Sequence, residues 1–245
     1  MALPIPTLSE GRVTIRPIRL RDARSLEREL IANRSWLRQW EASDPRGGAP
    51  FDVRASIRSL QQNARVGGGL PFIIEWDGQL AGQLNVSNIG YGSLSSASIG
   101  YWVAERFAGR GLTPTSVALA TDYAFFDLGL HRIEICIRPE NGPSLRVVDK
   151  LGFRYEGLRR RYIHINGDWR DHFCFALVGE EVPRGVLRRW LDGQVPHEVG
   201  VPSDADLRAS HRSGLSGPPS GIGLAAPSHR LIGDGSADPY GHTYP

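Results

Sequence analysis

The chain has 245 residues, of which 40% are hydrophobic and 22% are charged, enough for one sizeable α/β domain or two small ones. A formal net charge of +3 is too small to indicate nucleic-acid binding, and no apolar run approaches the length of a membrane span. The N-terminus lacks a signal-peptide pattern, and Cys136 and Cys174 show no disulfide or CxxC motif, so we expect two buried free thiols in a cytoplasmic protein without membrane or nucleic-acid partners.

The first half of the chain alternates between strand-like and helix-like patterns. Period-two alternation indicates strands, and apolar residues three and four apart indicate helices. Asp52 is a favourable N-cap, and Asp77-Gly78 is a typical hairpin turn pair. The predicted elements are, in chain order, a strand over 11–18 and a helix over 20–31, which 34–40 either extends or follows as a short second helix. A helix over 53–66 and strands over 72–76, 80–89 and 98–103 come next.

The second half continues with mixed elements and then changes character. Asn166-Gly167 is another hairpin turn pair. The predicted elements are a helix over 113–126, a strand over 131–137, a helix over 144–151, strands over 153–165 and 169–178, and a short helix over 186–191. Gly, Ser, Pro and Ala dominate beyond residue 200, and such a segment buries too little apolar surface to offset its ordering entropy. We therefore predict a domain over 1–200 and a disordered tail over 201–245.

A glycine-spaced loop lies between the predicted strand 98–103 and the predicted helix 113–126. It reads Arg106-Phe-Ala-Gly109-Arg-Gly111. Such a loop exposes backbone N–H groups at the positive end of the helix dipole, which suits a pyrophosphate. The glycines do not follow the first strand as G-x-G-x-x-G, and no G-K-[ST] is present, so neither a Rossmann nor a Walker A loop is indicated.

Two further elements stand in register with this loop. Asn141 is followed three residues on by Ser144, and Lys150-Leu-Gly-Phe153 ends the next predicted helix. With the glycine loop, these residues resemble the GCN5-related N-acetyltransferase (GNAT) superfamily over about residues 10–180. The resemblance implies an α/β (α+β) fold with a central, mixed, mostly antiparallel twisted sheet flanked by helices. It also implies that this sheet splays between its fourth and fifth strands, predicted here over 98–103 and 131–137.

Within the superfamily, the chain is similar to the RimJ/RimL branch. The segments that carry this similarity are 13–17, 100–103, 152–159 and 166–171. The branch implies acetylation of a protein's N-terminal α-amine, of the ribosomal-protein-alanine type, by a monomer or homodimer. Two alternatives stay open: acetylation of a small amine or antibiotic, and a non-catalytic acyl-CoA-binding module.

The resemblance implies that acetyl-CoA, as donor and without a metal, lies in the splay. Backbone groups of Trp102 and Val103 would pair with the pantetheine amides, and Asn141 would bind the same arm or cap its helix. The residues implied around the pyrophosphate are Arg106, Ala108, Gly109, Arg110, Gly111, Leu112 and Thr113. Pro114 removes one possible amide contact, but proline is well tolerated in a first helical turn.

Acyl transfer to an amine needs proton transfers and an oxyanion donor. The Val103 N–H is the candidate oxyanion donor, and Ser144 would assist the thiol or cap its helix. Glu134 would act as base directly or through water, or form a salt bridge with an arginine. His164 has a suitable ordinary pKa, and transfer through ordered water without a dedicated base is a further alternative.

The acceptor groove is implied around Trp36, Trp40 and the loop at 44–50. Aromatic walls suit a peptide, whereas a cluster of carboxylates would suit a polycation. The acids in this region are Glu41, Asp44 and Asp52. This small number favours the peptide.

Overall fold

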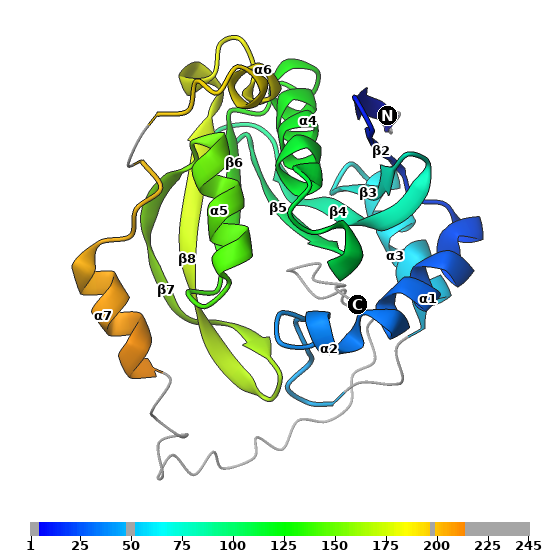
Figure 1. Ribbon diagram of the computed structural model, residues 1–245, viewed down its shortest axis with the longest axis horizontal. Coiled ribbons are helices and arrows are strands. Elements are labelled where there is room, and N and C mark those ends of the chain that lie inside the picture. Colours follow the sequence, from blue (N-terminus) through cyan, green and yellow to red (C-terminus); the bar gives the residue numbers. More distant parts are fainter. Residues whose placement is uncertain (1–4, 48–51, 197–198, 214–245) are drawn as a thin grey trace.

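The computed structural model describes residues 5–47, 52–196 and 199–213, and one eight-stranded sheet forms its centre (Figure 1). The strand order is β1-β2-β3-β4-β5-β6-β8-β7. The strands are β1 (Leu8–Glu10), β2 (Val13–Pro17), β3 (Leu70–Trp76), β4 (Gln79–Gly90), β5 (Ser96–Val103), β6 (Arg132–Ile137), β7 (Arg154–Ile165) and β8 (Asp168–Val178). All neighbouring pairs are antiparallel except β5–β6, which is parallel. This mixed, mostly antiparallel sheet confirms the predicted fold class.

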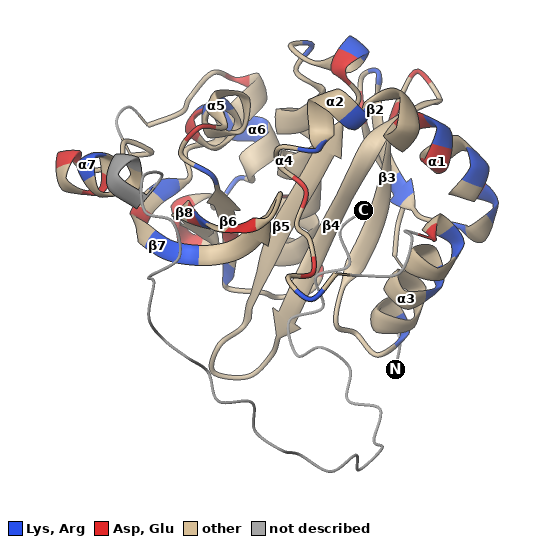
Figure 2. Ribbon diagram, turned by 90° about the horizontal axis from the view of Figure 1, so that it is seen from below, with Lys and Arg blue, Asp and Glu red and all other residues tan. Residues whose placement is uncertain are grey.

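Helices cover both faces of the sheet. They are α1 (Ala23–Ala32), α2 (Arg34–Leu37), α3 (Val53–Arg65), α4 (Leu112–Phe126), α5 (Gly142–Leu151), α6 (Val186–Leu191) and α7 (Asp204–Ser213). Figure 1 shows α4 and α5 side by side, and Figure 2 shows α1 and α3 next to β3. Within the described ranges, no helix combines the length and apolar character needed to cross a membrane.

The sheet separates two hydrophobic cores. The larger core packs one face of the sheet against α4, α5 and α6, and its fully buried members include Phe72, Phe153 and Phe175. The smaller core packs Ile73 on the opposite face against apolar residues of α1, α2 and α3. Because strand side chains alternate between faces, the neighbours Phe72 and Ile73 enter different cores.

The strands β5 and β6 separate soon after they begin. Their pairing covers only Ser96 with Arg132, Ala97 with Ile133 and Ser98 with Glu134. Beyond these pairs, β5 continues to Val103 and β6 to Ile137 without joining. The edge of each strand that faces the gap is left without a backbone partner there, so the predicted splay between these two strands is confirmed.

The tip of the β7–β8 hairpin contacts the segment that follows α2, although the two are far apart in sequence. Ala42 forms an isolated antiparallel bridge with Ile165. The Ser43 N–H donates to the His164 carbonyl at 2.9 Å. At this tip, Asn166 and Gly167 both have positive φ, as the predicted two-residue turn requires. These contacts close one side of the space beside the diverging ends of β5 and β6.

The predicted elements 11–18 through 186–191 are all found, with small shifts in their ends. The short strand β1 was not predicted, because three residues carry too little periodicity. Helix α7 differs from the expected disorder of 201–245. Ser203 bonds to Asp206 at its start, the Tyr155 hydroxyl donates to Asp206 at 2.8 Å, and Leu207 packs on the larger core. The rest of the predicted tail, 214–245, lies outside the described residues, and the domain boundary stays a prediction.

Replacing Gly82 by alanine is expected to push β4 away from β5. A Cβ at this position would lie 2.1 Å from the Trp102 carbonyl oxygen, a backbone atom that cannot rotate away. We expect the free energy of unfolding to fall by about 1–3 kcal/mol, measured by urea denaturation. Gly90→Ala, on the same strand, is the matched control, since its Cβ meets only the flexible Leu94 side chain at 3.2 Å. Equal losses in the two variants would contradict this account.

Candidate active site

Two adjoining cavities lie where β5 and β6 separate. We call the first the glycine-loop cavity. Counting the space open to solvent, it has a volume of about 1070 Å³, and its walls are the end of β5, the start of α4, α5 and α2. The second, the hairpin cavity, has a volume of about 840 Å³ on the same basis and lies between α2, β5, β6 and the β7–β8 hairpin. Both cavities are lined by Leu37, Trp40, Tyr101, Trp102, Asn141 and Ser144. These six residues mark the junction of the two spaces.

The glycine loop turns the chain from β5 into α4. Gly109 and Gly111 have φ of +76° and +79°, a region that favours glycine. The Thr115 N–H donates to the Gly111 carbonyl at 3.1 Å, which begins the helical ladder. The N–H groups of Leu112 and Thr113 precede this bond and have no partner within the helix, and Pro114 follows them in the first turn. The loop therefore presents backbone donors to the cavity at the positive end of α4.

Most residues predicted to bind acetyl-CoA line the glycine-loop cavity. Nine of the eleven do so: Trp102, Val103, Ala108, Gly109, Gly111, Leu112, Thr113, Asn141 and Ser144. Arg106 does not line it. Its guanidinium forms a two-pronged ion pair with Glu29 and lies over the Phe107 ring, which ties the loop to α1. Arg110 does not line it either, and its guanidinium is 6.0 Å from the Phe107 ring centre.

Two cations that the sequence analysis did not select line the same cavity. Arg146 and Lys150 lie four residues apart on α5, so they share one face of that helix. The Lys150 ammonium also lies 5.7 Å from the ring centre of Trp190. Both follow Asn141 on the same short helix, and this position in the sequence was the signal that would have identified them.

The end of β5 offers its free backbone edge to the gap. The Ala104 N–H donates to Ala81 on the β4 side at 2.8 Å. Successive residues of a strand direct their backbone groups to alternate edges, so Val103 directs its N–H toward the gap. The Val103 carbonyl accepts a hydrogen bond from the Trp36 indole at 3.2 Å, which ties α2 to this edge.

Tyr101, Asn141 and Ser144 form the polar part of the junction. The Asn141 side-chain oxygen accepts from the Ser144 N–H at 3.2 Å, so Asn141 caps α5 while lining both cavities. The Tyr101 hydroxyl is buried beside Ser144 and has no well-formed hydrogen bond. Burial raises the pKa of Tyr101, and the Ser144 hydroxyl opposes that rise. Tyr101 was not predicted, because nothing in the sequence brings a residue of β5 beside the start of α5.

Glu134, the predicted base, lines neither cavity. Its carboxylate accepts from Arg132 at 2.7 Å and from Arg159 at 2.9 Å. Both bonds are salt bridges of the kind that the sequence analysis kept as the alternative role. This placement favours the salt bridge over proton abstraction from an acceptor in the cavities.

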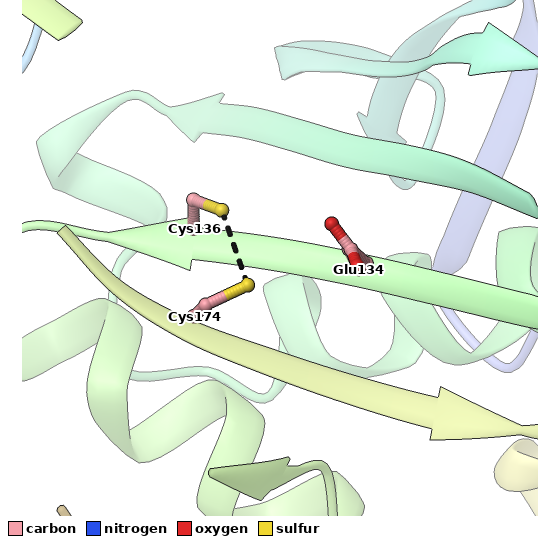
Figure 3. Close-up of side chains that lie close together, drawn as sticks. All are labelled: Glu134, Cys136 and Cys174. Carbon is pink, nitrogen blue, oxygen red and sulfur yellow. Dashed lines mark hydrogen bonds between the residues drawn. The ribbon is translucent and has the colours of Figure 1, made fainter. Parts of the chain in front are cut away.

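Glu134 also lies near the two thiols, as Figure 3 shows. The Sγ atoms of Cys136 and Cys174 are 3.6 Å apart, and both thiols are free. Cys174 is buried and Cys136 partly so. Arg159 already donates to Glu134 and, at 3.4 Å, to the Cys136 sulfur, so a metal cation here would have to displace a guanidinium. The cluster does not fit a metal site in this arrangement.

The hairpin cavity contains Glu41, which lies beyond the end of α2. One carboxylate oxygen accepts from Arg34 at 2.5 Å, and the other, Oε1, is buried without a partner. Burial raises the pKa of Glu41, and the charge of Arg34 opposes the rise. Glu41 was expected near the acceptor groove but without a role, because only the fold brings it beside β5 and β6.

Two histidines lie near this cavity. His172 lines it and is buried; its Nδ1 is 3.0 Å from the Arg170 carbonyl, which can only accept, so Nδ1 carries the hydrogen. Burial lowers the pKa of His172 to about 4, so its ring is neutral near pH 7. His164, considered as a base from sequence, contacts the Ser43 carbonyl at 2.9 Å and holds the hairpin tip in place.

Comparison with known proteins identifies a family and several relatives to which this chain is similar. Residues 12–154 match the family model of the acetyltransferase (GNAT) domain. The chain is 29% identical over 179 residues to the [ribosomal protein uS5]-alanine N-acetyltransferase of Escherichia coli, covering 72% of this chain and 92% of that protein. It is 40% identical over 105 residues to the probable N-acetyltransferase YjcK of Bacillus subtilis, but this match spans only 43% of this chain and 58% of that relative.

Among solved structures, the chain is similar to Mycobacterium smegmatis RimJ in complex with CoA-disulfide. The TM-score is 0.69 at 38% identity, and the match covers 74% of this chain and 89% of that one.

The neutral buried His172 is expected to make stability depend on pH. In the unfolded chain its pKa returns toward 6.5, so the unfolded state takes up a proton that the folded state accepts only near pH 4. Stability from this group is complete above pH 6.5 and is lost as the pH falls toward 4, by about 2 kcal/mol between pH 7.5 and 5. Urea unfolding at both pH values should show a smaller loss in His172→Asn, whose amide can still donate to Arg170. An identical loss would contradict the assignment.

Proposed function

The chain belongs to the GNAT family of acetyl-CoA-dependent N-acetyltransferases, and we propose that its acceptor is the N-terminal α-amine of a protein, of the ribosomal-protein type. The observation that carries the proposal is the pair of cavities that meet at Tyr101, Asn141 and Ser144. A donor in one cavity and an amine in the other would meet at this junction. Holding two reactants in contact is itself a large part of catalysis.

The glycine-loop cavity has the chemistry expected of a coenzyme A site. Backbone donors at the start of α4 suit a pyrophosphate, and Arg146 and Lys150 add positive charge on the opposite wall. The indole N–H of Trp102 is buried without a partner. Such a group is costly unless a ligand satisfies it, so Trp102 fits the donor.

The groups at the junction suit acyl transfer. Acetyl-CoA supplies an activated thioester when it is bound. The Val103 N–H, directed toward the gap, is positioned to donate to the oxygen that gains negative charge during transfer. With acetyl-CoA in the glycine-loop cavity, Tyr101 and Ser144 would be the hydroxyls that supply a proton to the departing sulfur, and the raised pKa of Tyr101 keeps that hydroxyl protonated. Asn141 fixes Ser144 by capping α5.

The hairpin cavity favours an acceptor with one positive charge. Among its described lining residues, Glu41 is the one carboxylate, and Arg138 adds a guanidinium. Trp40, Ile163 and Ile165 provide apolar walls. A polyamine needs several carboxylates, whereas an α-amine at the end of a peptide needs one. The E. coli relative, which is named for an alanine of a ribosomal protein, supports the same class. Such an acceptor would place the enzyme in the cytoplasm.

An acceptor panel tests the proposal. We expect release of free CoA, and a mass increase of one acetyl group, with peptides that begin with Ala, Ser, Thr or Met. Matched peptides with a blocked N-terminus and an internal lysine should react at least about 10-fold more slowly. Polyamines and aminoglycosides serve as the competing class. Reaction confined to small amines would overturn the α-amine proposal, and binding of acetyl-CoA without any turnover would favour the non-catalytic alternative.

Removing the junction hydroxyls should slow transfer. Because they handle the proton of the departing thiol, Ser144→Ala and Tyr101→Phe are expected to lower kcat by about 10- to 100-fold while the Kd for acetyl-CoA changes little. Steady-state kinetics and calorimetric titration measure the two quantities. Ser116→Ala, a buried hydroxyl on α4 outside both cavities, is the matched control. Unchanged kcat in both junction variants would exclude this role.

A further inference from the structure

Residues before and after Glu41 in the sequence make contacts that hold its carboxylate in the hairpin cavity. Helix α2 ends just before it, and the following residues pair with β7 through the Ala42–Ile165 bridge and the bond from the Ser43 N–H to His164. On the other side, the indole of Trp36 is bonded to the Val103 carbonyl. The backbone that carries Glu41 is therefore anchored both to β5, next to the junction, and to the hairpin.

The two oxygens of this carboxylate have different surroundings. Oε2 is paired with Arg34, while Oε1 is fully buried and has no hydrogen-bond partner, and the side chain as a whole is 14% exposed. A buried carboxylate oxygen without a donor is destabilising, and a cationic N–H donor entering the cavity would satisfy it. The Arg34 side chain is 63% exposed, so its charge is partly screened and does not fully compensate the burial.

The other ionisable groups of the cavity are not suited to hold an ammonium group. They are Tyr101, Cys136, Arg138 and His172. Arg138 is a cation that bonds to the Gln39 carbonyl at 2.6 Å and to Glu140 at 3.1 Å. His172 is neutral, and Cys136 has a pKa raised by the neighbouring thiol and by burial. Tyr101 keeps its proton beside Ser144.

We propose that Glu41 binds the ammonium group of the acceptor through Oε1 and takes its first proton, which sets the acceptor class as a primary amine with no second positive charge nearby. This inference rests on the proposed function and deepens it. The selectivity arises because Arg34 is paired with the carboxylate and Arg138 lines the same cavity, so a second cation on the acceptor would be repelled by them.

The proton balance is complete without another reactant. The acceptor R–NH3⁺ gives one proton to Glu41 and becomes R–NH2. Its nitrogen forms the new N–C bond to the acetyl carbon, the C–S bond breaks, and the sulfur takes the second nitrogen proton by way of the junction hydroxyls. Glu41 returns its proton to water. The sum is R–NH3⁺ plus acetyl thioester giving the N-acetyl amide, the thiol and one proton.

Glu41→Gln keeps the shape of the side chain and removes its charge. We expect kcat/KM for an Ala-initiated peptide to fall by at least about 100-fold at pH 7, with the Kd for acetyl-CoA and the melting temperature near those of the parent. In the parent, kcat/KM should rise with pH as Glu41 ionises. The variant should lose this step and recover activity only as the free amine forms at higher pH. A purely structural role would not change the pH profile in this way.

Glu75→Gln is the matched control. Glu75 is also a partly buried carboxylate, paired with Arg16 at 2.8 Å, but it lies outside both cavities. Its variant should keep the parent's kcat/KM and pH profile. Glu134→Gln and His172→Asn are measured in parallel, and a large loss confined to either of them, with Glu41→Gln unaffected, would overturn the inference.

A binding measurement separates this inference from the proposed function. With CoA bound, the parent should bind a free-amine peptide at least about 10-fold more tightly than its N-acetylated form, and Glu41→Gln should lose that difference. Parental kinetics and binding preference in Glu41→Gln would overturn the role of Glu41 while leaving the acceptor proposal intact. If the panel instead reveals a different primary amine as acceptor, the α-amine proposal fails, and the same variant tests Glu41 with that amine.

Discussion

The separation of β5 and β6 is the constraint on which the rest of the site depends. Two parallel strands that pair at three positions and then diverge leave free backbone edges in the middle of a sheet. Unpaired backbone groups in a protein interior are costly, so this arrangement persists only where a ligand or solvent can satisfy them. The gap is stable because the sheet is secured elsewhere: long antiparallel pairs hold β5 to β4 and β6 to β8. The two hydrophobic cores then fix the helices on either face of the gap.

Ion pairs position the segments around the gap rather than acting inside it. Arg106 ties the glycine loop to Glu29 of α1, and Arg159 and Arg132 hold Glu134 outside the cavities. Glu41 is different, because it combines an arginine partner with a buried oxygen that has none. All three carboxylates lie close to arginines. Those of Glu29 and Glu134 hold segments of the structure together, whereas Glu41 keeps one oxygen free to bind a ligand.

The sequence was most informative where a local rule determines the structure. The Asp77-Gly78 and Asn166-Gly167 turns adopt the positive φ angles that their hairpins require, and Asp52 caps α3 as expected. The glycine loop was found from its spacing, because a helix entry is a short-range feature, and Asn141 and Ser144 were found through the family resemblance that this short segment carries. Helix α7 was missed for the opposite reason. It has a local start at Ser203, but it is held by Tyr155 and by packing on a distant core.

The sequence by itself thus determined the family, the order of the elements and nine of the residues that line the glycine-loop cavity, because each follows from contiguous segments. Only the tertiary structure decided which side chains share the hairpin cavity. Glu41, Tyr101 and His172 come from three distant segments, and their proximity results from the strand order and from the contact between the hairpin tip and the chain after α2. It also placed Glu134 between two arginines. Burial, and with it the pKa and the availability of a carboxylate, depends on those long-range contacts and not on neighbours in the chain.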